Sequence, residues 1–176
     1  PYSYVSEAQM LDIYWPGEGN GPFPVIVAIH GGAFMGGDKR DRQVTPMLEG
    51  LSRGYAVVSI NYRMSGEAVF PALVYDVKAA IRWIRANART LLFDANKIAT
   101  WGGSAGGYLA LMAGVSGGVT ELEDLELGNA AVESRVQAVV DWFGPVNFLT
   151  MDEQLAASGM APPAPYAHNG AQSPES

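Results

Sequence analysis

The feature that most constrains the fold is a serine among glycines at residues 101–107, between two apolar segments. The run at 97–101 is typical of a short buried strand, and residues 108–113 are typical of a buried helix. A strand that turns this sharply into a helix leaves space beside the serine only for very small residues. The pattern predicts a nucleophile elbow, with the hydroxyl group of Ser104 projecting above the sheet. The G-x-S-x-G spacing alone does not exclude a simple turn without a chemical role.

Two other glycine-rich motifs are excluded. A phosphate-binding P-loop requires Lys followed by Ser or Thr after its last glycine, whereas Tyr108 follows Gly107. A dinucleotide-binding fingerprint beginning at Gly102 would place Ser104 where the second glycine must be, and that motif follows the first strand of its unit. Several predicted strands precede this one. Neither a phosphate nor a dinucleotide site is therefore expected at this turn.

Composition limits the class of protein. A chain of 176 residues with 48% hydrophobic residues is long enough for one domain with a sizeable core. The net charge of −7 argues against nucleic acid and anionic membrane surfaces as partners, because both attract basic patches. The absence of cysteine excludes disulfides and thiolate metal sites but does not assign a compartment. No apolar run reaches the ~18 residues that a membrane span requires.

Predicted strands and helices alternate along the chain. Helical patterns occur at residues 43–53 and from Pro71 onward, and strand patterns occur at residues 9–15, 23–30, 55–60, 97–101 and 136–143. This alternation predicts an α/β fold with a mostly parallel, doubly wound sheet, in which residues 23–30 form a central strand. The apolar periodicity fades after Met151. We therefore expect residues 1–150 to form the domain and residues 151–176 a flexible or lid-like tail.

Charged residues in the second half have simple structural interpretations. The helix after Pro71 is amphipathic, and its basic residues, which include Lys78 and Arg82, are expected on a solvated face. Asp76, in the first turns of this helix, is expected to have a structural role. The acidic segment 118–134 is interpreted as an exposed connection, although metal binding by some of its carboxylates stays open.

A second stretch with chemical potential follows the predicted central strand, at residues 30–34. Glycines at the carboxyl end of such a strand leave backbone N–H groups free to point above the sheet, as an oxyanion hole requires. The alternative is a glycine-rich strand exit without a ligand. His30 precedes the glycines, where we expect it to bond nearby backbone and hold the loop rather than act as a general base.

Four stretches, in this order, resemble the α/β-hydrolase esterases of the carboxylesterase and hormone-sensitive-lipase type: residues 30–34, residues 61–63 with 70–72 and Asp76, residues 102–107, and residues 141–145. The last of these and residues 36–39 are more similar to the bacterial feruloyl or acetyl-xylan esterase-like branch. The resemblance extends from about Met10 to Met151. It implies an α/β-hydrolase sheet that lacks its last strands, the amino-terminal part of such a domain, and an extracellular location.

The resemblance also implies roles for individual residues. Ser104 would be the nucleophile that forms an acyl-enzyme with an ester of a short acyl group or of an acylated plant polysaccharide. The oxyanion hole would be formed by the N–H groups of Gly32, Ala33 and Ala105. The residues expected to contact substrate are Phe34, Tyr62 and Trp142. No cofactor and no metal ion are implied.

The acid and histidine of the triad depart from the family pattern, in which both follow the serine on later strands. Asp141 lies one strand too early, and an in-chain triad would have to use Asp141 or Asp152 with His168. We expect these two groups instead on a carboxy-terminal remainder of the same hydrolase. The alternatives are an acylaminoacyl-type serine peptidase and a non-catalytic hydrolase-like domain that binds a partner or ligand.

Overall fold

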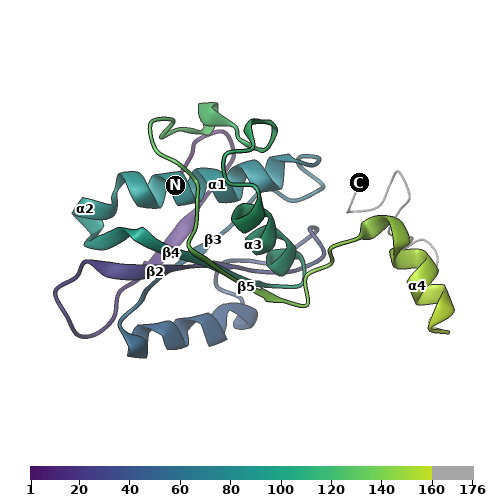
Figure 1. The fold of residues 1–176 in the computed structure, drawn as a ribbon, viewed down its shortest axis with the longest axis horizontal. Coiled ribbons are helices and arrows are strands. Elements are labelled where there is room, and N and C mark those ends of the chain that lie inside the picture. Colours follow the sequence, from purple (N-terminus) through teal and green to yellow (C-terminus); the bar gives the residue numbers. More distant parts are fainter. Residues whose placement is uncertain (160–176) are drawn as a thin grey trace.

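A five-stranded sheet forms the centre of the molecule (Figure 1). The structure is a computed structural model that describes residues 1–159. The strands are β1 (Leu11–Tyr14), β2 (Phe23–Ile29), β3 (Ala56–Ile60), β4 (Phe93–Gly103) and β5 (Ala138–Trp142), in the spatial order β1-β3-β2-β4-β5. Only β1 is antiparallel to its neighbour, with Leu11 opposite Ile60. The predicted α/β class and the mostly parallel sheet are confirmed.

Helices cover both faces of the sheet. On one face lie α1 (Ala72–Ala86) and α3 (Ala105–Val115), and on the other lies the 3-10 helix η1 (Arg42–Arg53) (Figure 1). The remaining elements are α2 (Ala88–Leu91), η2 (Thr120–Leu122), η3 (Leu125–Leu127), η4 (Phe148–Thr150) and α4 (Met151–Ala157). Strand β2 lies between β3 and β4, where Val25, Val27 and Ile29 are fully buried. This confirms the central position predicted for residues 23–30.

Two elements differ in detail from the prediction. The segment predicted as a regular helix at 43–53 is a 3-10 helix, and it contains Pro46. Proline has no N–H group and its ring crowds the preceding turn, so the regular α-helical bonding pattern is interrupted there. The predicted glycine cap is present, because Gly54 adopts a left-handed conformation with φ 79°. Strand β4 begins earlier than predicted, at Phe93, and ends directly before Ser104.

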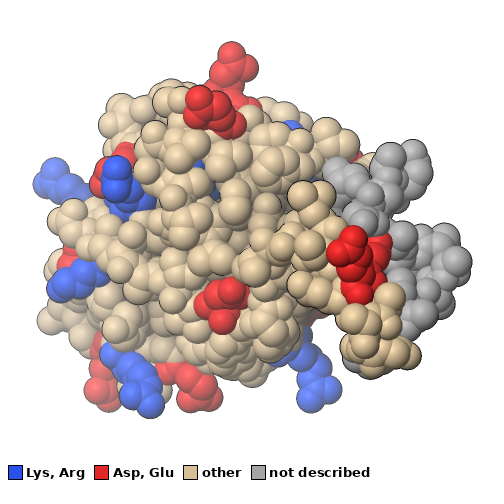
Figure 2. Space-filling model, turned by 45° about the vertical axis from the view of Figure 1, so that its right-hand side comes forward, with Lys and Arg blue, Asp and Glu red and all other residues tan. Residues whose placement is uncertain are grey.

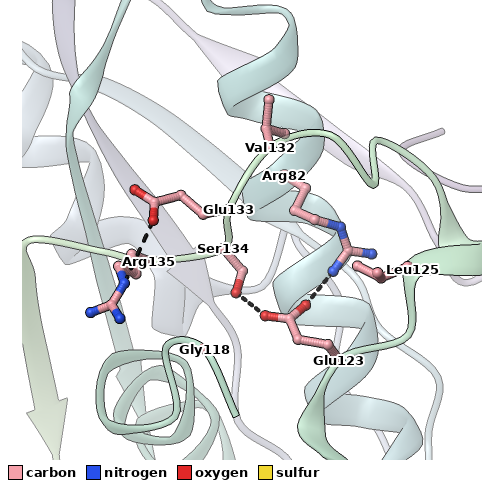
Figure 3. Close-up of a pocket in the computed structure, with 8 residues that line it drawn as sticks. All are labelled: Arg82, Gly118, Glu123, Leu125, Val132, Glu133, Ser134 and Arg135. Atoms are coloured by element: carbon pink, nitrogen blue, oxygen red, sulfur yellow. Dashed lines mark hydrogen bonds and ion pairs between the residues drawn. The ribbon is translucent and has the colours of Figure 1, made fainter. Parts of the chain in front are cut away.

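The expectation of a solvated basic face on α1 is wrong for two residues. Lys78 and Arg82 are fully buried, because the segment 116–136 crosses over this helix. Arg82 forms an ion pair with Glu123, and Ser134 donates a hydrogen bond to the same carboxylate (Figure 3). The acidic connection is therefore partly buried rather than wholly exposed. Among residues 1–159, no group of three or more His, Asp or Glu side chains is arranged to hold a metal ion.

Asp76 has the structural role expected of it, through a different contact. Its fully buried carboxylate accepts hydrogen bonds from the Arg63 guanidinium and backbone N–H and from the Gln9 side chain at 2.8 Å. The hydrogen bonds to Asp76 raise the pKa of Arg63, and the pair ties the end of β3 to α1 and the amino-terminal segment.

The tail is described only in part. Residues 151–157 form α4, and residues 160–176, which include His168, lie outside the described residues. The division at residue 150 and the lid-like tail stay predictions. Within residues 1–159, no helix is both long and apolar enough to cross a membrane.

Candidate active site

Ser104 lies between the end of β4 and the first residue of α3, with φ 55° and ψ −125°. A residue with a side chain rarely adopts this conformation, and the surrounding contacts hold it there. The Ser104 N–H group donates to the Trp142 carbonyl oxygen at 2.9 Å, and the Tyr108 N–H group donates to the Ser104 carbonyl oxygen at 3.0 Å. The strand, sharp turn and helix predicted around this serine are all present.

The glycines of this turn are required by close backbone contacts. A Cβ atom on Gly102 would collide with the carbonyl group of Gly106 and lie 2.8 Å from the nitrogen of Gly107. A Cβ atom on Gly106 would lie 2.6 Å from the carbonyl oxygen of His30. Cβ atoms rarely come within 3.0 Å of such atoms. The first turn of α3 therefore packs directly on the end of β2, which sets Ser104 beside the loop that follows this strand.

The loop at residues 30–34 lies next to the elbow because Ile29 of β2 pairs with Gly102 of β4. A Cβ atom on Gly31 would lie only 3.3 Å from the Cβ atom of Ser104. Gly32 and Ala33 are exposed and have positive φ angles of 124° and 52°. Within residues 1–159 their N–H groups donate no hydrogen bond to another backbone group.

Ala105 adds a third backbone donor at the same end of the sheet. It is the first residue of α3, where an N–H group has no acceptor within its own helix. Such N–H groups also lie at the positive end of the helix dipole. The loop after β2 and the start of α3 thus offer, near Ser104, backbone N–H groups that have no acceptor among residues 1–159, an arrangement that can stabilise a negatively charged oxygen.

His30 holds the loop, as expected from the sequence. Its imidazole is fully buried and stacks on the ring of Tyr62 at 4.6 Å between centroids. Nδ1 lies 2.8 Å from the carbonyl oxygen of Gly31, and because a carbonyl oxygen only accepts, Nδ1 carries the proton. Burial lowers the pKa of His30 and keeps the ring neutral. This imidazole is part of the loop's support and not a base open to substrate.

The three residues expected to contact substrate lie in different surroundings. Phe34 and Tyr62 are buried, and the Tyr62 hydroxyl donates to the carbonyl oxygen of His30 at 2.8 Å. Trp142 is 38% exposed and packs edge-on against Trp101, with 5.0 Å between ring centroids. Only Trp142 is accessible in this structure, and substrate contact by these three residues stays a prediction.

Sequence reasoning missed an aromatic cluster next to the elbow. Phe34 packs edge-on against Tyr108 and Phe148, with ring centroids 5.7 Å and 6.1 Å away. Tyr108 and Phe148 are themselves 5.1 Å apart. The position of Tyr108, one helical turn after Ser104, is a signal in the sequence that points to this cluster. No such signal points to Phe148, because this residue lies more than forty residues after Ser104 in the sequence.

The candidate acids are not assembled with a histidine among the described residues. Asp141 Oδ1 accepts a hydrogen bond from the Gly144 N–H group at 2.8 Å and packs against Gly107. Asp152 lies in α4. His30 is the only histidine within residues 1–159, and it is buried. A triad that uses His168 falls outside the described residues.

Comparisons with known proteins agree with this geometry. The BD-FAE family model matches residues 11–174. The "Probable carboxylic ester hydrolase LipM" of Mycobacterium tuberculosis is 32% identical over 157 residues, which cover 88% of this chain and 36% of LipM. The chain thus spans about a third of the length of the curated relatives it matches.

Two solved structures are similar in fold and sequence. The "Bifunctional GH43-CE Bacteroides eggerthii" protein has a TM-score of 0.85 and 38% identity, covering 99% of this chain and 24% of that protein. The "Truncated form of carbohydrate esterase from gut microbiota" has a TM-score of 0.77 and 41% identity, covering 86% of this chain and 57% of that one. With the elbow and the neighbouring glycine loop in place, the chain belongs to the BD-FAE family and has an α/β-hydrolase fold related to that of esterases.

Proposed function

We propose that this chain supplies the nucleophile and the oxyanion-binding groups of a serine carboxylic-ester hydrolase. The strained backbone of Ser104, directly beside the exposed loop at Gly32 and Ala33, is the observation that carries the proposal. A structural turn has no need of such strain, whereas a nucleophile on a sharp turn does. The esterase relatives support the same reaction class.

The proposed reaction proceeds through an acyl-enzyme. Ser104 Oγ attacks the ester carbonyl carbon while a histidine accepts the hydroxyl proton, and the oxygen of the tetrahedral intermediate becomes negative. The N–H groups of Gly32, Ala33 and Ala105 donate hydrogen bonds to this oxygen. Each such donor contributes about 3 kcal/mol to stabilisation of the transition state. The histidine gives the proton to the departing alcohol oxygen as the bond from the carbonyl carbon to this oxygen breaks, and water then hydrolyses the acyl-Ser104 ester to release the acid and free Ser104.

We place the acid and the histidine on polypeptide of the same hydrolase beyond this sequence. The relatives' greater length supports this, and so does the outer edge of β5, which no other strand of residues 1–159 covers. Val140 and Trp142 are partly exposed on one face of that edge, and beside them the buried indole N–H group of Trp101 has no hydrogen-bond partner among the described residues. Further strands beside β5 and a layer over this face would cover these groups.

The proposed substrates are short acyl esters or acylated plant polysaccharides. A structural neighbour is named a carbohydrate esterase, which supports a sugar-linked ester. The face of the molecule drawn in Figure 2 is mostly uncharged, with acidic and basic side chains scattered over it. Together with the net charge of −7, this surface favours a neutral ester over an anionic polymer.

Hydrolysis of p-nitrophenyl acetate by the full-length polypeptide tests the proposal. Ser104→Ala should lower kcat at least ~10³-fold, because it removes the nucleophile and leaves only binding and the oxyanion hole. Ser52→Ala, at an exposed serine of η1, serves as the matched control and should leave the rate unchanged. Unchanged hydrolysis in Ser104→Ala would remove Ser104 from its role and favour the non-catalytic binding domain.

A further inference from the structure

We propose that Gln43 is a positioning residue that fixes the peptide groups at Gly31 and thereby the oxyanion loop beside Ser104. The inference rests on the proposed function, since it concerns the same site. Gln43 lies in the first turn of η1, and a Cβ atom on Gly31 would lie 3.0 Å from Gln43 Oε1 and 3.3 Å from the Cβ atom of Ser104. No feature of the sequence around Gln43 predicts this role.

Gln43 contacts both polar backbone groups of Gly31. The Gly31 N–H group donates to Gln43 Oε1 at 2.9 Å, and Gln43 Nε2 donates to the Gly31 carbonyl oxygen at 3.4 Å. Gly31 lies beyond the last paired residue of β2, so the ladder does not hold its backbone. One side-chain amide takes the place of a neighbouring strand, bonding a donor and an acceptor at once.

The orientation of this amide is itself fixed. Asp41 Oδ2 accepts from Gln43 Nε2 at 3.4 Å and from the Asp38 N–H group at 2.9 Å. The NH₂ group of Gln43 therefore faces Asp41 and the Gly31 carbonyl oxygen, and Oε1 is left to face the Gly31 N–H group. A carboxylate in place of this amide would keep the acceptor, lose both donations and be repelled by Asp41.

The loop needs such external support because its backbone is strained. Three consecutive residues, Gly32, Ala33 and Phe34, have positive φ angles, and two of them carry side chains. Conformations of this kind persist only where surrounding contacts determine them. Beyond the loop, Asn61 bonds both Asp38 and the backbone of Lys39. Gln43 provides the corresponding support where the loop begins, at Gly31, which lies beside Ser104.

The consequence concerns catalysis more than folding. Gln43 is exposed, so its replacement leaves the core intact. The Gly31 carbonyl oxygen also accepts from His30 Nδ1 at 2.8 Å, so the bond that only Gln43 supplies is the one from the Gly31 N–H group. Without that bond the strained loop is held on one side alone, and the N–H groups of Gly32 and Ala33 spend less time aimed at the developing oxyanion. Since these donors act chiefly in the transition state, the loss falls on kcat and not on KM.

The test uses the full-length hydrolase with Gln43→Met, which keeps side-chain length without hydrogen bonds, and Gln43→Glu, which keeps the acceptor alone. Removing an oxyanion donor outright costs ~10²–10³-fold in kcat, so loss of positioning should lower kcat by about 10–100-fold in both variants. KM for p-nitrophenyl acetate should stay within about threefold. The inhibition constant of a trifluoromethyl ketone, which forms an oxyanion adduct with the serine, should rise in parallel with the loss of kcat/KM.

The control is Thr45→Met, an exposed position on the same helix, which should match the unmodified enzyme. The inference is overturned if either folded Gln43 variant keeps kcat within twofold, or if KM rises while kcat is unchanged. The Ser104→Ala variant distinguishes failure of the proposed function from failure of the proposed role of Gln43. If that variant stays active, the proposed function itself fails. If it is inactive while Gln43→Met behaves as unmodified enzyme, only the role of Gln43 fails.

Discussion

The backbone conformation of Ser104, which the proposed function requires, lowers the stability of the folded protein. Its φ of 55° with ψ of −125° lies in a region that glycine occupies far more easily than serine. The turn keeps this conformation because the Ser104 N–H group is bonded to Trp142 and the flanking glycines allow α3 to pack on β2. The stored strain is of the order of 1–3 kcal/mol.

Ser104→Gly should therefore be more stable than Ser104→Ala, although both are inactive. Alanine keeps the strain, whereas glycine relieves it at a cost of ~0.5–1 kcal/mol in unfolded-state entropy. We expect the free energy of unfolding, measured with urea, to be about 1 kcal/mol higher for the glycine variant. A glycine variant less stable than the alanine variant would show that the backbone here is not strained.

His30 should make the stability of the protein depend on pH. Burial lowers its pKa in the folded state, so the unfolded chain binds the proton more readily than the folded one. The contribution of neutral, buried His30 to the free energy of unfolding is complete above the usual imidazole pKa of about 6.5. It is lost as pH falls from that value toward the lower pKa of the folded state. Unfolding free energies between pH 5 and 8 should decline toward the acid end, and His30→Gln should reduce this slope. An identical slope in the variant would contradict the assignment.

The amino-acid sequence predicted some residues of this site but not others. Ser104 and the loop at residues 30–34 could be predicted, because two backbone segments approach closely only where glycine is present. The spacing of the glycines in the sequence therefore indicates where these contacts occur. The role of Gln43 is not recorded locally. It depends on how η1 docks beside β2, which places Gln43 against Gly31, twelve residues earlier.

At the scale of elements, the contact between α1 and the segment 116–136 is held by buried cations. Lys78 Nζ donates to the Ser116 carbonyl oxygen at 2.8 Å, and Arg82 donates to the carbonyl oxygens of Asp124 and Gly128 at 2.6 Å and 3.1 Å. Both cations pair with Glu123, and Figure 3 shows the pair with Arg82. The side chains thus satisfy backbone groups that have no helix or strand partner.

Arg82→Met should loosen this segment. The change leaves the Asp124 and Gly128 carbonyl groups without their Arg82 donor, while Glu123 keeps Lys78 and Ser134. Each buried acceptor that is left unsatisfied costs about 1–3 kcal/mol. Amide hydrogen exchange should accelerate across residues 116–136 before it does so in the central strands. Arg89→Met, at an exposed arginine of α2, is the matched control. Equal exchange in the two variants would show that Arg82 does not hold the segment.

The helical pattern did not predict this burial. Periodicity identified the apolar stripe of α1 that faces the sheet, and this stripe is buried as expected. It carries no information on what covers the opposite side of the helix. The partner carbonyls of Arg82 lie more than forty residues later in irregular backbone, so their approach depends on tertiary structure alone.

At the scale of the whole molecule, the β5 edge of the sheet and the segment after it expose apolar residues. The alternation of strands and helices predicted a parallel sheet, but it gave no strand order. Strand β5 occupies one end of the sheet, and its outer edge is unpaired among the residues that the structure describes. Exposed apolar residues continue past it, including Phe143 at 81% exposure and Leu149 at 80%. An apolar, unprotected edge of this kind invites another strand.

In the full-length hydrolase, β5 amides that do not bond β4 should therefore be protected from hydrogen exchange. The expected protection approaches that of the central strand β2, because a further strand would bond the free edge. Exchange followed by mass spectrometry of peptides covering residues 138–142 measures it. Rapid exchange of this strand in the complete protein would mean that no added strand covers the edge and that the triad is not completed beside it.

The central claim, that Ser104 is an activated nucleophile, is tested most directly by covalent labelling. The full-length protein is treated with a fluorophosphonate, and intact mass and peptide mass spectrometry locate the adduct. The account predicts one phosphonyl group on Ser104, formed rapidly in folded protein and absent from Ser104→Ala. Folded protein that stays unlabelled, or that is labelled at another residue, would contradict it.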